Sequence, residues 1–211
     1  MWWQFLVCIA IGYLVGSIPV GLLIGRIARG IDIREFGSGK TGFTNVVRTV
    51  GARWGVVALI GDLAKGAAPV VVARILSDDP FVAMAAGLAT AVGHDWPVFA
   101  GFKGGRGVAA SYGVILALNP IAGLALLPLG LAIIGITRIV SLMSVVMAPV
   151  FAIVFIVLAA LDLHPWAYAI YAIAAAALIV ALHWENVQRL VAGTEPRFGE
   201  GGSRHEGAQA S

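Results

Sequence analysis

Seven runs of apolar residues, separated by short polar segments, make up most of the chain. They lie at roughly 3–25, 54–76, 81–101, 107–118, 121–136, 139–161 and 165–183. A helix crosses the roughly 30 Å hydrocarbon layer with about 20 apolar residues, and apolar positions that are continuous rather than alternating exclude a barrel. The pattern predicts an all-α integral membrane protein, a seven-helix transmembrane bundle. Its fourth and fifth helices are short because the Asn119-Pro120 turn divides them.

Composition and charge placement add an orientation to this bundle. Hydrophobic residues make up 60% of the chain and charged residues only 12%, whereas soluble domains are about 25% charged. Lys and Arg concentrate on the cytoplasmic side of membrane proteins. No basic residue precedes the first run, whereas Arg26 and Arg29 follow it, so we expect the N-terminus outside and the C-terminus in the cytoplasm. With seven crossings, the cytoplasmic basic residues are Arg26, Arg29, Arg34, Lys40, Arg48, Arg53, Lys103, Arg106, Arg138, Arg189, Arg197 and Arg204.

The remaining composition limits the number of domains and the classes of partner. We expect a single domain over residues 1–199 and a disordered, Gly-rich cytoplasmic tail over residues 200–211. The single Cys8 excludes an internal disulfide. A nucleic-acid partner would need a basic face with aromatic residues, and the sequence has none. We expect the lipid bilayer as surroundings and no required protein partner.

The first of three polar, Gly-rich segments on the predicted cytoplasmic side covers residues 35–51. Its glycines allow backbone N–H groups to converge on an anion, its hydroxyl groups add donors, and Arg48 offers a guanidinium. The candidate phosphate ligands are Gly37, Ser38, Gly39, Lys40, Thr41, Thr44, Asn45 and Arg48. The alternative is a Gly-rich turn with a solvated basic face. A nucleotide-binding P-loop is excluded because the position five residues before Gly39 is Arg34 rather than glycine.

The second polar segment covers residues 93–107. Lys103 and Arg106 frame the pair Gly104-Gly105, and a helix is predicted to begin near Val108. Cations beside a helix N-terminus suit an anion, although basic residues that anchor the chain at the cytoplasmic surface are the alternative. No His or Cys residues are spaced as zinc ligands, so we expect no metal and no cofactor.

The third polar segment covers residues 183–199. His183 and Asn186 share one face of a helix, and the alternative is a plain amphipathic terminus. Asp62 and Lys65 lie inside the second apolar run, where ionisable residues are costly and often functional. At a spacing of three residues they are equally able to pair with each other.

In this order and spacing, the three segments resemble the PlsY family of bacterial glycerol-3-phosphate acyltransferases, over the chain up to about Gly199. The resemblance is carried by Gly16-Ser17-Ile18-Pro19, Gly37-Ser38-Gly39, Gly42, residues 44–49, Gly61-Asp62, Lys65-Gly66, Gly93-His94, residues 97–99, residues 102–109, residues 183–186, Arg189-Leu190 and residues 192–196. The chain departs from the usual family residues at three positions. These are Lys40 in place of Asn, Phe43 in place of Ala and Arg106 in place of Lys.

The resemblance implies transfer of an acyl group from acyl-phosphate to the 1-hydroxyl of glycerol-3-phosphate, in the bacterial cytoplasmic membrane. The products would be lysophosphatidic acid and inorganic phosphate, in the first step of phospholipid synthesis. By this resemblance His183, Asn186, Ser38 and Arg48 would be catalytic. The residues that would bind substrate are Gly37, Gly39, Lys40, Thr41, Thr44, Asn45, Lys103, Gly104, Gly105 and Arg106. His183 would act as general base, or the acyl-phosphate oxygens would accept the proton themselves.

Three rival classes predict other patterns. The acyl-CoA-dependent acyltransferases carry Asp five residues after a His, and no His here has it. An anion transporter would show inverted repeats and polar residues at mid-membrane, whereas the polar residues here cluster at one predicted face. A metal-dependent headgroup enzyme would need paired carboxylates on the cytoplasmic loops.

Overall fold

The computed structural model describes residues 2–200 and 203, and the part described is helical. The α-helices are α1 Trp2–Gly16, α2 Val20–Arg29, α3 Phe43–Thr49, α4 Ala52–Leu76, α5 Pro80–Asp95, α6 Val108–Leu118, α7 Pro120–Thr137, α8 Val140–Ala160, α9 Trp166–Leu182 and α10 Trp184–Val191. Two short 3-10 helices, η1 Ile33–Glu35 and η2 Val98–Ala100, lie in the loops before α3 and α6.

The predicted first run, 3–25, forms two helices. Pro19 lacks an N–H group and restricts the residue before it, so helix α1 ends at Gly16 and α2 begins at Val20. The break leaves the Ile18 carbonyl outside the helical hydrogen bonds, and Lys65 Nζ donates to it at 2.7 Å. Lys65 also pairs with Asp62 at 3.0 Å, and both side chains are buried. These two charges therefore pair with each other inside the protein.

Four helical segments are long and apolar enough to cross a membrane: Trp2–Arg29, α4, α7 and α8. The pair α9 and α10, bent by 62°, makes a fifth. Helix α6 has 11 residues, about 17 Å at 1.5 Å per residue, which is well short of the hydrocarbon thickness. Helix α5 ends at Asp95 rather than near residue 101, because Pro97 disfavours helical backbone before it. The protein is multi-pass, while the seven crossings and the orientation stay predictions.

Close helix packing is possible because glycines face neighbouring backbones. Helix α1 packs along α5, α4 packs against α6, and α8 packs against α9. A Cβ at Gly16 would fall 2.9 Å from Thr90 Cα, so only glycine fits there. The main buried cluster spans these helices and includes Phe155 and Tyr171.

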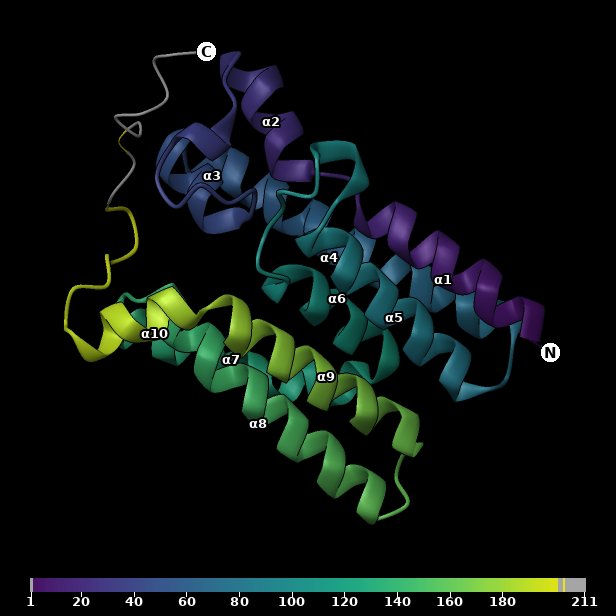
Figure 1. Cartoon of the computed structure of the whole chain (residues 1–211). Helices are drawn as coiled ribbons and strands as arrows, with labels where there is room; N and C mark the ends of the chain where they lie inside the picture. The colour runs from purple at the N-terminus through teal and green to yellow at the C-terminus, as the bar shows by residue number, and fades with distance from the viewer. Residues whose placement is uncertain (1, 201–202, 204–211) are drawn as a thin grey trace.

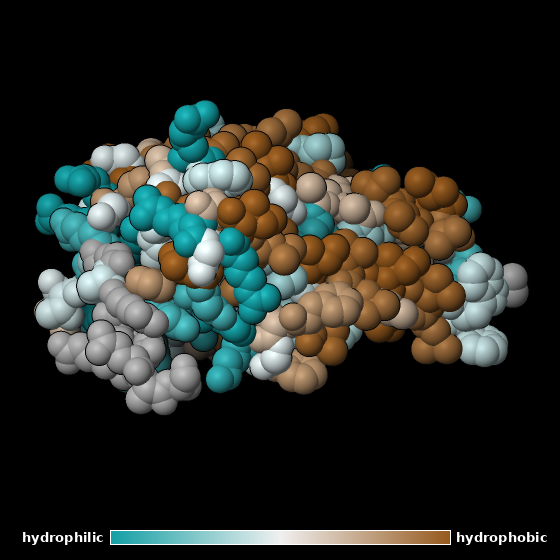
Figure 2. Space-filling view, turned by 90° about the horizontal axis from the view of Figure 1, so that it is seen from above, coloured by the Kyte–Doolittle hydropathy of each residue, from teal (hydrophilic) through white to brown (hydrophobic). Residues whose placement is uncertain are grey.

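The polar elements gather at one end of the bundle. Helices α2, α3 and α10 lie at the end opposite the N-terminus (Figure 1). Figure 2 shows polar side chains concentrated at one end and a broad apolar surface over much of the remainder. The single-domain assignment of residues 1–199 stays a prediction. The predicted disorder of residues 200–211 lies outside the described residues except at Glu200 and Ser203.

Candidate functional site

The first polar segment forms a loop organised by Asn45, a fully buried residue in the first turn of α3. The Asn45 amide nitrogen donates to the carbonyls of Ile33, Phe36 and Lys40, at 2.8, 3.1 and 2.8 Å. Its Oδ1 accepts from the Ser38 N–H at 3.1 Å. The Asn45 side chain therefore holds the loop in shape, and substrate contact by it stays a prediction.

Three backbone N–H groups of this loop donate hydrogen bonds within the protein. Those of Gly37, Gly39 and Thr41 donate to the carbonyls of Ser203, Phe36 and Gly104, at 3.0, 3.0 and 3.4 Å. Gly37 and Gly39 have positive φ, as the sequence led us to expect of glycines in a tight loop. In this structure these three N–H groups are thus bonded within the protein, and contact of the loop with an anion stays a prediction.

The second polar segment folds back on the end of α5. The N–H groups of Gly104 and Gly105 donate to the carbonyls of Asp95 and His94, at 3.2 and 3.1 Å. The buried His94 ring fills the space next to Gly105, where a Cβ would overlap the ring Nε2. This packing fixes the path of the chain into Arg106 and the N-terminus of α6.

Arg48 from α3 and Arg106 from the second loop form a cationic cluster with Arg189 from α10. Burial lowers the pKa of Arg48 and Arg106, and the other guanidinium groups of the cluster lower both further. The Nε atoms of Arg48 and Arg106 are enclosed and have no hydrogen-bond partner among the described residues. Half-buried guanidinium groups that repel one another and keep an unpaired, enclosed Nε suit an anion.

Glu195 is the carboxylate of this cluster. It accepts from Ser141 Oγ at 2.7 Å, from Asn186 Nδ2 at 2.6 Å and from Arg189 Nε at 2.7 Å. Burial alone would raise the pKa of Glu195, but these hydrogen bonds lower it below its ordinary value. The three guanidinium groups and the Glu195 carboxylate sum to a formal charge of +2, and Glu200 near Arg48 and Glu185 near Arg106 add negative charge around them. The sequence pattern does not single out Glu195 or Ser141, although Glu195 lies in a segment that carries the family resemblance.

His183 and Asn186 lie side by side in this cluster, where α9 meets α10, and both are buried. His183 Nδ1 lies 2.8 Å from the Ile179 carbonyl. A carbonyl only accepts, so Nδ1 carries the proton and the neutral ring keeps the lone pair on Nε2. Likewise the Asn186 amide nitrogen is fixed by Glu195, and its buried Oδ1 has no partner within the described part of the chain. Both side chains thus offer an acceptor to a hydroxyl group.

Other predicted ligands lie outside this cluster. Lys103 is exposed and lines a separate cavity of about 560 Å³ with Arg26, Arg34 and Phe99. Thr41 is buried, while Ser38, Lys40 and Thr44 are half-buried on the first loop. No group of three or more His, Cys, Asp or Glu side chains suited to a metal occurs in the described ranges.

Phe43, one of the positions that depart from the family pattern, contacts the C-terminal segment. Its ring stacks on Phe198 with centroids 5.9 Å apart. The Phe198 N–H donates to the Arg138 carbonyl at 2.6 Å. The segment carrying Glu195 is therefore held at both α3 and the C-terminal end of α7.

Comparison with known proteins identifies the family that this chain matches. A family model described as glycerol-3-phosphate acyltransferase matches residues 6–193. A glycerol-3-phosphate acyltransferase of Geobacter sulfurreducens is 45% identical over 92% of this chain and 97% of its own length. One from Synechococcus sp. strain CC9902 is 43% identical over 93% and 96%. The crystal structure of PlsY (YgiH), an integral membrane glycerol 3-phosphate acyltransferase, in the glycerol 3-phosphate form, is 38% identical with a TM-score of 0.84, over 92% of this chain and 96% of that one.

Proposed function

The chain belongs to the glycerol-3-phosphate acyltransferase family, and from that premise we propose that its acyl donor is an acyl-phosphate. The 1-hydroxyl oxygen of glycerol-3-phosphate attacks the acyl carbonyl carbon, and the bond from that carbon to the phosphate oxygen breaks. The products are 1-acyl-glycerol-3-phosphate, which is lysophosphatidic acid, and inorganic phosphate. The hydroxyl proton leaves with a base or with the departing phosphate.

The observation that carries this proposal is the pair of enclosed guanidinium Nε atoms of Arg48 and Arg106. Arg48 lies in α3 and Arg106 in the second loop, and both lie within electrostatic reach of Arg189 and Glu195. Two phosphate-bearing substrates must be held close together, and a phosphate must leave with increased charge. Preorganised cations in an enclosed site serve both purposes.

His183 and Asn186 supply the acceptors for the attacking hydroxyl. The lone pair on His183 Nε2 follows from the hydrogen bond between Nδ1 and Ile179. We propose that Nε2 takes the proton while Asn186 Oδ1 orients the glycerol. If the acyl-phosphate oxygens take the proton instead, His183 only orients. Replacing His183 by Ala separates the two roles, because loss of a base removes the acid limb of the pH–rate profile, whereas loss of an orienting group lowers the rate at every pH.

The site also suggests where the reaction takes place. The polar end holding the cluster is also the end rich in basic residues, which favours the cytoplasmic side of a bacterial membrane. We propose that seven crossings place the N-terminus outside and the site inside. Ser38 would bind the leaving phosphate from the first loop.

The decisive experiment measures phosphate release from purified protein given palmitoyl-phosphate, with and without glycerol-3-phosphate and without added metal. Palmitoyl-CoA is tested in parallel as donor. Release that depends on glycerol-3-phosphate, with acyl-phosphate alone as donor, supports the proposal. Activity with palmitoyl-CoA alone would refute the acyl-phosphate donor, and no release from folded protein would refute the reaction.

A further inference from the structure

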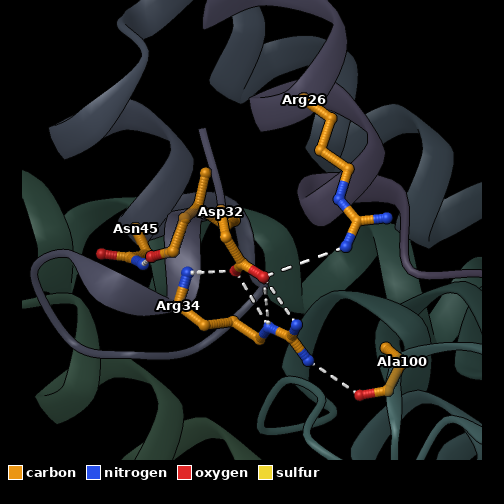
Figure 3. Close-up of polar contacts among 6 residues, drawn as sticks. Arg26, Asp32, Arg34, Asn45 and Ala100 are labelled. Carbon is orange, nitrogen blue, oxygen red and sulfur yellow. Dashed lines mark hydrogen bonds and ion pairs between the residues drawn. The ribbon is translucent and has the colours of Figure 1, made fainter. Parts of the chain in front are cut away.

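Arg34 joins the two glycine-rich loops, although the sequence analysis gave it no role. Its Nε and Nη2 donate to the two carboxylate oxygens of Asp32, at 2.9 and 2.6 Å. Its Nη1 donates to the Ala100 carbonyl at 2.8 Å, across 66 residues of chain. Figure 3 shows this guanidinium between Asp32 and Ala100, with Arg26 approaching the same carboxylate from α2.

At the first loop, the residues around Arg34 are held in place by several contacts. The Arg34 N–H donates to Asp32 Oδ1 at 2.9 Å, which caps η1. Ile33 is fully buried and packs against Gly25 of α2, where no Cβ would fit. Asn45 then ties the same loop to α3. A displacement of Arg34 would therefore be a displacement of the loop that leads to Arg48.

On the second loop, the contact lies where the chain turns toward the site. Ala100 ends η2, and the next residues, Gly101 and Phe102, both have positive φ. The Ala100 carbonyl also accepts from the Lys103 N–H at 3.4 Å. The Gly104-Gly105 pair and Arg106 follow directly. A further hydrogen bond between these loops runs from the Thr41 N–H to the Gly104 carbonyl and is long, at 3.4 Å.

We infer that Arg34 is a positioning residue for acyl transfer, which sets the spacing between the loop of Arg48 and the loop of Arg106. The inference rests on the proposed function, because it takes these two cations as the phosphate ligands. Arg34 reaches neither substrate in this role. Its planar fork satisfies a carboxylate and a carbonyl at once, and the compact ammonium group of a lysine does not reproduce that geometry. The hydrogen bonds from Arg34 lower the pKa of Asp32, so the pair is ionised at neutral pH.

The test compares Arg34→Ala and Arg34→Lys with Arg26→Ala. Arg26 approaches the same Asp32 carboxylate at 4.0 Å, but its side chain is 60% exposed, and within residues 2–200 no hydrogen bond links it to the second loop. Arg26→Ala thus removes a positive charge near Asp32 and leaves the hydrogen bonds between the two loops in place. For each purified variant, kcat, the KM of both substrates and the thermal unfolding midpoint are measured.

If Arg34 positions the loops, Arg34→Ala lowers kcat about 10- to 100-fold, because a misplacement of about 1 Å has an effect of that size. Each KM stays within about threefold, since each loop still carries its own ligands. Arg34→Lys recovers little, and Arg26→Ala stays near wild type. Asp32→Asn added to Arg34→Ala costs less than twofold more, because Asn keeps the cap of η1 and loses only the carboxylate of the same connection. A raised KM with unchanged kcat, or a lowered unfolding midpoint with unchanged kcat, would overturn the inference.

Amide hydrogen exchange gives a readout that does not depend on turnover. The N–H groups of Gly104 and Gly105 donate to the end of α5, so a loosened second loop exposes them to exchange. We expect several-fold faster exchange in a peptide covering residues 98–107 for Arg34→Ala and no change for Arg26→Ala. If the wild type makes no lysophosphatidic acid, the proposed reaction fails while exchange still tests the connection. Equal exchange in both variants would refute the positioning role.

Discussion

Gly105→Ala is a substitution for which the structure predicts a large effect from a single methyl group. A Cβ at position 105 would overlap His94 Nε2 and lie 2.9 and 3.0 Å from two carbons of the ring. Ordinary contacts begin at 3.4 Å, so the ring and the loop must separate by about 1 Å. The ring is 4% exposed and its Nδ1 faces Asp62 at 3.6 Å. It has little room to move, and the loop must shift instead.

That shift displaces Arg106, the next residue of the chain, relative to Arg48. A misplacement of about 1 Å costs about 100-fold in rate, so we expect kcat/KM of Gly105→Ala to fall by about that factor. Overpacking also costs about 1–3 kcal/mol of stability, which thermal unfolding of the purified variant measures. The assay is phosphate release at saturating and at limiting glycerol-3-phosphate.

Gly42→Ala is the matched control. Gly42 also carries the family resemblance, but a Cβ there would meet no atom within 4 Å, and its φ of −80° suits any residue. We expect at least half of wild-type activity. A fully active Gly105→Ala would refute the steric reasoning. An inactive, folded Gly42→Ala would show that the glycines serve substrate contact rather than packing.

Three further predictions concern the cationic cluster and its neighbours. Arg48→Ala and Asn186→Ala are expected to lower turnover at least about 100-fold with an unchanged unfolding midpoint, and retained activity in folded protein would remove them from the site. Lys40→Asn is expected to stay active, because the Lys40 side chain lies outside the cluster; an inactive variant would show that this chain depends on its unusual residue. Hydrogen bonds lower the pKa of Glu195, so its stabilising effect is complete above its ordinary pKa of 4.5 and is lost as pH falls through the lowered folded value. Unfolding midpoints measured from pH 6 to 3 should therefore fall more steeply for wild type than for Glu195→Gln. Equal slopes would contradict the assignment.

The sequence predicted the helical, membrane-embedded character correctly, because hydrophobicity over about 20 residues is a local property. Helix boundaries were predicted well where proline or a turn marks them, as at Asn119-Pro120. The break between α1 and α2 was missed, although Pro19 marks it. The run of apolar residues continues through the break, and hydropathy alone does not register a missing hydrogen bond.

The candidate site was predicted in part for the same reason. The residue types and the three segments were visible, and the structure brings Arg48, Arg106, His183 and Asn186 together. The sequence left Lys103 and Arg106 equivalent, yet Lys103 lines a different cavity. The two residues are three positions apart in an irregular loop, where neither helical nor strand periodicity fixes the direction of a side chain.

The sequence by itself determined the apolar spans, the cations and the glycines that allow tight loops, because these depend on residue type and neighbours along the chain. Only the tertiary structure decided which groups meet. Three N–H groups of the first loop donate to protein carbonyls. Glu195 of the C-terminal segment accepts a hydrogen bond from Asn186, and Arg34 donates to the Ala100 carbonyl across 66 residues. Such contacts follow from how the helices pack. The free energy of that packing comes from contacts throughout the core, so no single segment of sequence determines it.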